Sequence, residues 1–105
     1  MPASMHYDAF AALAGKACRL ESLDREGPAV DLPAVLVEVG ERKERYVYEQ
    51  FALLFKATEA GWPQQGNYRV TFEGDDPREI FLVPVARSGD QVDYEAVFYR
   101  TPPAA

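Results

Sequence analysis

Hydrophobic and polar positions alternate with a period of two residues along most of this chain. Successive side chains of a β-strand point to opposite faces, so this alternation predicts extended structure. Short clusters of Gly, Pro, Asp and Ser interrupt the pattern and predict turns. The six expected strands cover residues 17–23, 34–39, 46–57, 68–73, 80–85 and 92–98, and the charged residues 41–45 are expected to form a connection.

A short stretch before these strands has a helical pattern instead. Residues 7–14 are rich in Ala and Leu, which favour helix, and Phe10 and Leu13 recur at helical spacing. Gly15 follows as a residue that ends a helix in the left-handed conformation. Two helical turns are not stable alone, so we expect this helix to pack on the sheet.

The connections between strands are too short for the helical crossovers that parallel strands need, which favours an antiparallel sheet. Three strands carry apolar residues on both faces and therefore need a second layer, at 35–39, 51–55 and 80–85. We predict a mainly β (α+β) fold, a six-stranded antiparallel barrel or sandwich with a short N-terminal helix. Residues 1–105 are expected to form a single domain whose ordered core covers about 7–100.

The same pattern predicts which side chains are buried. Phe55 and Phe81 are expected in the core, where a change to alanine would cost roughly 3–5 kcal/mol. Asp93 is expected to face water, where alanine would cost within about 0.5 kcal/mol. Pro84 has no N–H, so it is expected at a sheet edge, a bulge or a strand end.

Composition and charge exclude several classes of protein. Hydrophobic residues make up 48% of the chain, which is enough to exclude pervasive disorder. The net charge of −6 argues against nucleic acid, because phosphate binding requires clustered Lys and Arg. No apolar run approaches the roughly 20 residues of a membrane helix, so no membrane partner is expected. Cys18 is the single cysteine, which suits a reducing, cytoplasmic location.

Residues with catalytic chemistry are few. His6 is the single histidine, and a general base or metal ligand needs positioned neighbours. Cys18 alternates with a charged residue on an apolar strand face, which is typical of a buried, inert thiol. Asp75 and Asp76 precede a proline in a pattern more typical of a turn than of a metal loop. We therefore expect no catalytic residue, no metal, no cofactor and no enzymatic activity.

Aromatic residues remain as candidates for a binding surface. Trp62 adjoins Pro63 in a loop rich in Gln and Gly, and would either close one end of a barrel or anchor a partner or a sugar. Tyr46, Tyr48 and Tyr99 would add an exposed stripe, although tyrosine pairs across strands are also ordinary sheet packing. These four aromatic residues are the candidate partner or ligand contacts.

Several blocks of the sequence, taken in order, resemble a family of small bacterial domains of unknown function. The helical block FAALAG at 10–15 is similar to the family pattern F-x-x-L-x-G, and the later blocks are LLF at 53–55, PQQGNY at 63–68, FLVPV at 81–85 and YEAVF at 94–98. The resemblance spans roughly residues 7–99, and its motifs are structural. It implies proximity to phage-derived proteins of the tail-collar type, and hence an accessory or assembly role.

We therefore expect a non-enzymatic structural or interaction module, accessory to a phage-tail-like or collar-type assembly. It would bind a protein partner or a second copy of itself, as a homodimer, through a sheet face or edge. The alternative is a small-ligand or glycan-binding β domain that uses the loop aromatics around Trp62.

Overall fold

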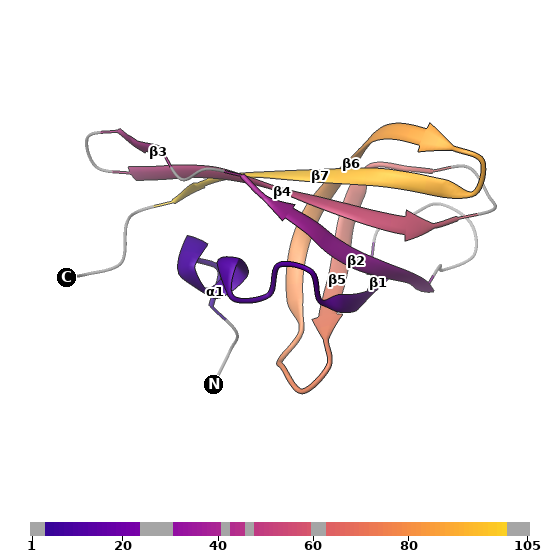
Figure 1. Cartoon of the computed structure of the whole chain (residues 1–105), viewed down its shortest axis with the longest axis horizontal. Coiled ribbons are helices and arrows are strands. Elements are labelled where there is room, and N and C mark those ends of the chain that lie inside the picture. The colour runs from indigo at the N-terminus through magenta and orange to yellow at the C-terminus, as the bar shows by residue number, and fades with distance from the viewer. Residues whose placement is uncertain (1–3, 24–30, 41–42, 46–47, 60–62, 101–105) are drawn as a thin grey trace.

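The computed structural model describes residues 4–23, 31–40, 43–45, 48–59 and 63–100, and the side chains of 43–45, 48, 49, 99 and 100 lie outside the description. This part of the chain forms one helix and seven strands (Figure 1). They are α1 (Tyr7–Ala11), β1 (Ala17–Ser22), β2 (Asp31–Val39), β3 (Lys43–Arg45), β4 (Tyr48–Thr58), β5 (Gly66–Phe72), β6 (Arg78–Ser88) and β7 (Gln91–Arg100).

Six of these strands close into an antiparallel barrel. Their hydrogen-bonded order is β2-β1-β5-β6-β7-β4, and β4 pairs again with β2 to complete the circle. β3 is a short strand beside the start of β4, where the charge pattern predicts a connection. The predicted mainly β fold with six antiparallel strands and a short helix is confirmed. The sequence left a barrel and a sandwich open, and the structure is a closed barrel. Closure pairs most strand edges, which are liable to aggregate when exposed.

Local sequence explains how consecutive strands are joined. β6 and β7 are connected by a two-residue loop between the paired Ser88 and Gln91. Gly89 in this loop has φ +61°, a value that residues with a Cβ adopt at a cost. Between β5 and β6, the Asp75 carboxylate accepts a hydrogen bond from the Asp76 N–H at 2.9 Å. The Asp75 side chain therefore stabilises the turn between β5 and β6, as its position two residues before Pro77 predicts.

Inward-facing side chains fill the barrel with a continuous apolar core. Its fully buried members include residues from every strand of the barrel, such as Leu20, Leu36, Phe55, Val70, Leu82 and Tyr94. Six strands enclose only enough space for such side chains, since barrels that hold a small ligand usually have about eight. The interior is therefore a packed core.

Two β-bulges interrupt the alternation of inward and outward residues. One lies in β2 just after Leu36, and the other lies in β6 just after Pro84. Each bulge adds one valine to the outer surface, Val37 and Val85, which are 40% and 52% exposed. The bulge in β6 confirms the expectation for Pro84, because a residue without an N–H fits where the ladder is interrupted.

Phe81 contradicts the core prediction made from the sequence. Its side chain is 51% exposed on the outside of β6, whereas Phe55 is completely buried as expected. The inward residues of this part of β6 are Ile80 and Leu82. Alternation separates the two faces of a strand, but this run is apolar on both, so the pattern alone does not say which face is inside.

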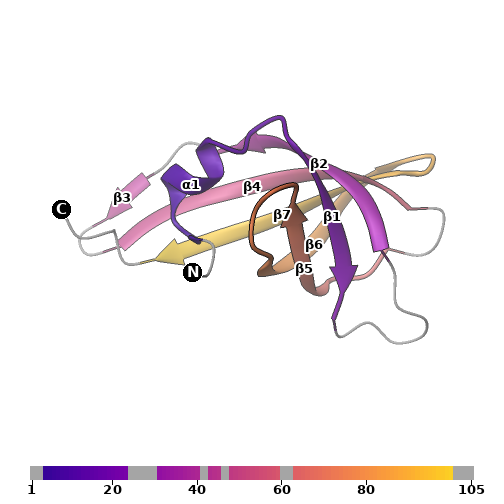
Figure 2. The ribbon, with the colours of Figure 1, turned by 90° about the horizontal axis from the view of Figure 1, so that it is seen from below.

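α1 covers one end of the barrel beside the long strands β4 and β7 (Figures 1 and 2). The helix ends at Ala11, earlier than the predicted residue 14, and turns continue to Gly15 at φ +83°. Phe10 is fully buried, with ring centroids 6.0 Å from Phe51 and 5.3 Å from Phe98. This helix is too short to be stable alone, so its packing on the barrel maintains it.

Candidate interaction surface

The aromatic residues that the sequence singled out lie wholly or partly outside the described residues. Trp62 and Tyr46 lie outside the described residues. Tyr48 and Tyr99 lie on β4 and β7, and their side chains are outside the description. Their role as partner or ligand contacts therefore stays a prediction.

One side of the outer surface is charged. Outward residues of β1, β5 and the start of β2 form ion pairs across the strands. Arg19 Nε lies 2.9 Å from Asp31 Oδ1, and Arg69 Nη1 lies 3.9 Å from Glu21 Oε2. All four side chains are about half exposed, so each pair contributes little stability. We call these four residues the charged outer side.

The other side of the outer surface is apolar. Four of its large side chains are between 40% and 52% exposed, and two more are partly exposed. Large apolar side chains that gather on one side of a protein commonly mark an interaction site. We call this set the apolar outer face, and its members are Val37 of β2, Leu54 of β4, Phe81, Val83 and Val85 of β6, and Val97 of β7.

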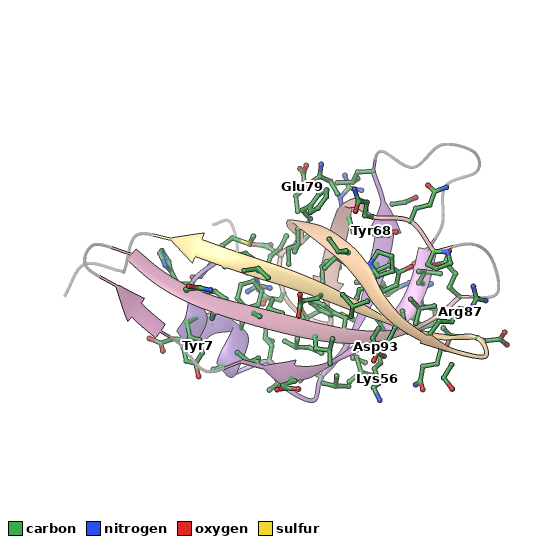
Figure 3. All side chains as sticks on the ribbon, turned by 90° about the horizontal axis from the view of Figure 1, so that it is seen from above. Tyr7, Lys56, Tyr68, Glu79, Arg87 and Asp93 are labelled. Atoms are coloured by element: carbon green, nitrogen blue, oxygen red, sulfur yellow. The ribbon has the colours of Figure 1, made fainter. Side chains whose placement is uncertain are left out.

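Charged residues of mostly one sign lie among these apolar side chains. Lys56 lies directly opposite Asp93 in the β4–β7 pairing, and both point outward (Figure 3). Glu38 and Glu95 add two further carboxylates, and neither forms an ion pair or hydrogen bond with another described residue. Among the described side chains, the apolar outer face therefore carries more negative than positive charge.

A small hollow on the apolar outer face lies between Glu38 and Glu95. Its volume is about 110 Å³, and it lies where the bulge in β2 changes the pairing with β4. The backbone approaches closely beside it, because the Gly40 N–H donates to the Ala52 carbonyl at 2.7 Å. A Cβ on Gly40 would lie 3.2 Å from that same oxygen, which favours glycine here. The hollow is lined by Glu38, Gly40, Ala52, Leu53, Leu54 and Glu95.

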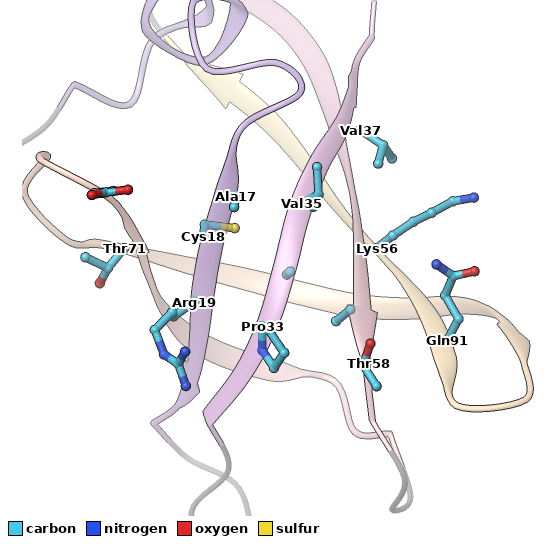
Figure 4. Close-up of a pocket in the computed structure, with 13 residues that line it drawn as sticks. Ala17, Cys18, Arg19, Pro33, Val35, Val37, Lys56, Thr58, Thr71 and Gln91 are labelled. Atoms are coloured by element: carbon cyan, nitrogen blue, oxygen red, sulfur yellow. The ribbon is translucent and has the colours of Figure 1, made fainter.

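A larger groove of about 690 Å³ adjoins the apolar outer face (Figure 4). It runs over the outside of β1, β2 and β4, and Val37 belongs both to this groove and to the apolar outer face. The ammonium of Lys56 and the amide of Gln91 lie on one side of it (Figure 4). The other residues that line the groove are Ala17, Cys18, Arg19, Pro33, Ala34, Val35, Ala57, Thr58, Thr71 and Glu73.

One hydrogen bond among the described residues joins two buried polar side chains. The Tyr94 hydroxyl donates to Glu59 Oε2, and both residues are at least 97% buried. Burial raises the pKa of Tyr94, and the hydrogen bond to Glu59 raises it further. Nearby, the Tyr68 hydroxyl donates to the Gln64 carbonyl at 2.7 Å. The alternation of hydrophobic and polar residues does not predict the contact between Tyr94 and Glu59. Glu59 follows the last residue of β4, a position where a solvent-exposed carboxylate is common.

The remaining candidate catalytic or metal-binding residues from the sequence are Cys18, Asp75, Asp76 and His6. Cys18 is buried, and burial raises the pKa of its thiol to about 12, so the thiol stays protonated at neutral pH. The Asp76 N–H and the Arg78 guanidinium lower the pKa of Asp75. His6 lies half-buried next to α1. Within the described residues, no three His, Cys, Asp or Glu side chains gather as metal ligands.

These features define a small antiparallel β-barrel that is capped by a helix and apolar on one outer side. The chain belongs to the family described as Domain of unknown function (DUF6916), whose family model matches residues 5–98. The resemblance to a small domain family of unknown function is thereby confirmed. No curated protein and no solved structure matches the chain. The described part of the chain contains no helix that is long and apolar enough to cross a membrane.

Proposed function

We propose that this protein is a non-enzymatic interaction module that binds a protein partner through the apolar outer face. The observation that supports the proposal is the exposure of Val37, Phe81, Val85 and Val97 on one side of the barrel. Each loses contact with water when a partner covers it, and the removal of apolar surface from water favours association.

The barrel makes a face more suitable than an edge for this association. β1, β2, β5 and β6 each pair with a neighbour on both sides. A partner strand that joins by main-chain hydrogen bonds needs an unpaired edge, and closure removes most of it. Side-chain contact across the sheet surface needs no such edge. The proposal therefore places the partner on the outer face.

The biological setting is a further part of the proposal. The resemblance to domains found near tail-collar-type proteins suggests an accessory role in a phage-tail-like assembly. A single cysteine, Cys18, suits a cytoplasmic location. A homodimer through the same face is the alternative to a different partner, because two-fold homodimers are the commonest soluble oligomers.

Site-specific photo-crosslinking in the cells that naturally express the protein tests the proposal. A benzoylphenylalanine would replace Phe81 or Val97 on the apolar outer face, and in matched controls Glu21 or Arg69 on the charged outer side. We expect one discrete crosslinked product from the first two positions and none from the controls. Equal products at all four positions, or none at any, would contradict the proposal.

The groove on β1, β2 and β4 favours a small-ligand site as a second candidate function. Its volume of about 690 Å³ lies within the 300–1,000 Å³ range of ligand sites, and its surface combines Pro33, Val35 and Val37 with the ammonium of Lys56. An apolar molecule with one anionic group would fit this combination. Titration of the labelled protein with decanoate, with decanol as the uncharged control, tests it by the amide shifts of Val35 and Lys56. Equal shifts with both compounds, or none, would contradict it.

A further inference from the structure

We propose that the partner presents a lysine or arginine side chain flanked by apolar residues, and that this cation enters the hollow between Glu38 and Glu95. This inference rests on the proposed function, since it names the chemistry of the partner that the apolar outer face would bind. The occupant is a protein segment, and a second copy of the chain is an outcome that would contradict the inference.

The strand register places the two carboxylates on either side of one apolar residue. Glu38 of β2 pairs with Leu54 of β4, and Leu54 pairs with Glu95 of β7. Adjacent strands are about 4.8 Å apart, so the two glutamates are on the order of 10 Å apart at their Cα atoms. A cationic group above Leu54 would therefore lie within reach of both flexible carboxylates.

The shape of the hollow suits a long basic side chain. Ala52 and Leu54 provide apolar contact for the methylene stem, and Glu38 and Glu95 line the same hollow. Lys and Arg commonly bury an apolar stem while their charged ends stay near water or an anion. The outer residues next to the hollow are Val37, Val83 and Val97, which would contact apolar neighbours of that side chain.

Charge decides between a basic partner and a second copy. Lys56 and Asp93 oppose each other, so Glu38 and Glu95 are the carboxylates of the face that no described side chain pairs with. Two copies joined through this face would bring four such carboxylates together, and each chain carries a net charge of −6. Like charges across an interface oppose association, whereas a basic partner is attracted both locally and at long range.

Titration with two capped heptapeptides tests the inference. One peptide alternates leucine and lysine, and its control alternates leucine and glutamate; the isotope-labelled full chain is followed by the amide shifts of Glu38, Leu54 and Glu95. We expect saturable shifts with the lysine peptide alone. Raising the salt concentration from about 0.05 M to about 0.5 M should weaken this binding several-fold, because salt screens the attraction between the carboxylates and the lysine side chains.

A pair of matched variants separates this site from general attraction to an acidic protein. Glu38→Gln/Glu95→Gln should weaken the lysine peptide about tenfold, as expected for the loss of two exposed charge contacts. Glu21→Gln/Glu73→Gln removes the same charge away from the face and should leave the affinity within about twofold. Equal losses in both double variants would contradict a specific site.

Other outcomes would also overturn the inference, and they are distinct from failure of the proposed function. Equal binding of both peptides, shifts confined to β1 and β5, or no saturable shift at millimolar peptide would each contradict it. Amide shifts on the apolar outer face that change with protein concentration in the absence of peptide would also contradict it, because they would identify a second copy of the chain as the occupant. Benzoylphenylalanine in place of Val97 could still crosslink with undiminished yield in the Glu38→Gln/Glu95→Gln background. That result would support the proposed interaction module and contradict the inference of a cationic partner.

Discussion

The guanidinium of Arg78 lies over the ring of Phe10, 5.2 Å from the ring centroid, and connects the N-terminal segment to the β5–β6 hairpin. Its Nε–H donates to the Ser4 carbonyl at 2.9 Å, and Nη1 lies 3.1 Å from Asp75 Oδ2. Arg78 is 5% exposed. A buried guanidinium requires such partners, because removing a charge from water without them is costly.

Replacement of Arg78 should weaken the attachment of the N-terminal segment to the barrel. Arg78→Leu removes the contacts to Ser4 and Asp75, and we expect it to lower the free energy of unfolding by about 1–3 kcal/mol. Arg69→Leu, at a half-exposed arginine, is the control and should change stability by less than about 0.5 kcal/mol. Urea titration of the two variants would measure the difference, and similar losses would contradict the role of Arg78.

Two phenylalanines should differ sharply in their contribution to stability. Phe55→Ala leaves a cavity in the core and should cost roughly 3–5 kcal/mol. Phe81→Ala removes a side chain that is 51% exposed, and should cost less than about 1 kcal/mol. Denaturant titration followed by circular dichroism measures both. A large loss for Phe81→Ala would show that its ring is buried in the folded protein.

The thiol of Cys18 should be protected while the protein is folded. Burial raises its pKa from 9.0 to about 12, so its thiolate fraction near pH 8 should be about a thousandfold lower than in the unfolded chain. We expect slow reaction with Ellman's reagent in buffer and fast reaction in urea. Fast reaction of the native protein would contradict burial of this thiol.

The same pKa difference makes stability depend on alkaline pH. Between pH 9 and 12 the unfolded state releases the Cys18 proton while the folded state keeps it, so stability falls as pH rises. From pH 9 to 10 this contributes a loss of about 1 kcal/mol in the free energy of unfolding. Cys18→Ala lacks this contribution and should show the shallower decline in urea titrations at the two pH values. Parallel declines would contradict the assignment to Cys18.

The Tyr94–Glu59 hydrogen bond should contribute measurably to stability. Tyr94→Phe leaves a buried carboxylate without this donor and should cost about 1–3 kcal/mol. The double-mutant cycle with Glu59→Ala, which removes the acceptor, should give a coupling of at least about 0.5 kcal/mol between the two residues. Additive effects of the single variants would mean that the hydroxyl and the carboxylate do not interact.

The candidate surface was harder to predict than the strands, and the reason is physical. The sequence directed attention to Trp62 and the tyrosines, because large aromatic residues often anchor interfaces, and to a sheet face, because three strands are apolar on both sides. The apolar outer face consists mainly of valines, two of which, Val37 and Val85, are exposed by β-bulges. A bulge depends on how two distant strands pair, which the pattern of one strand does not contain.

The alternation of side chains determined by itself the six antiparallel strands of the barrel, and the alanines and Gly15 determined a short helix before them. These are local properties, since two-residue periodicity and turn chemistry act over a few neighbouring positions. Only the tertiary structure decided that β4 returns to β2 to close the barrel, that Phe81 faces outward, and that Glu38 and Glu95 flank Leu54. Each of these depends on register between segments distant in sequence, where the best packing of the whole core selects among alternatives that are locally equivalent.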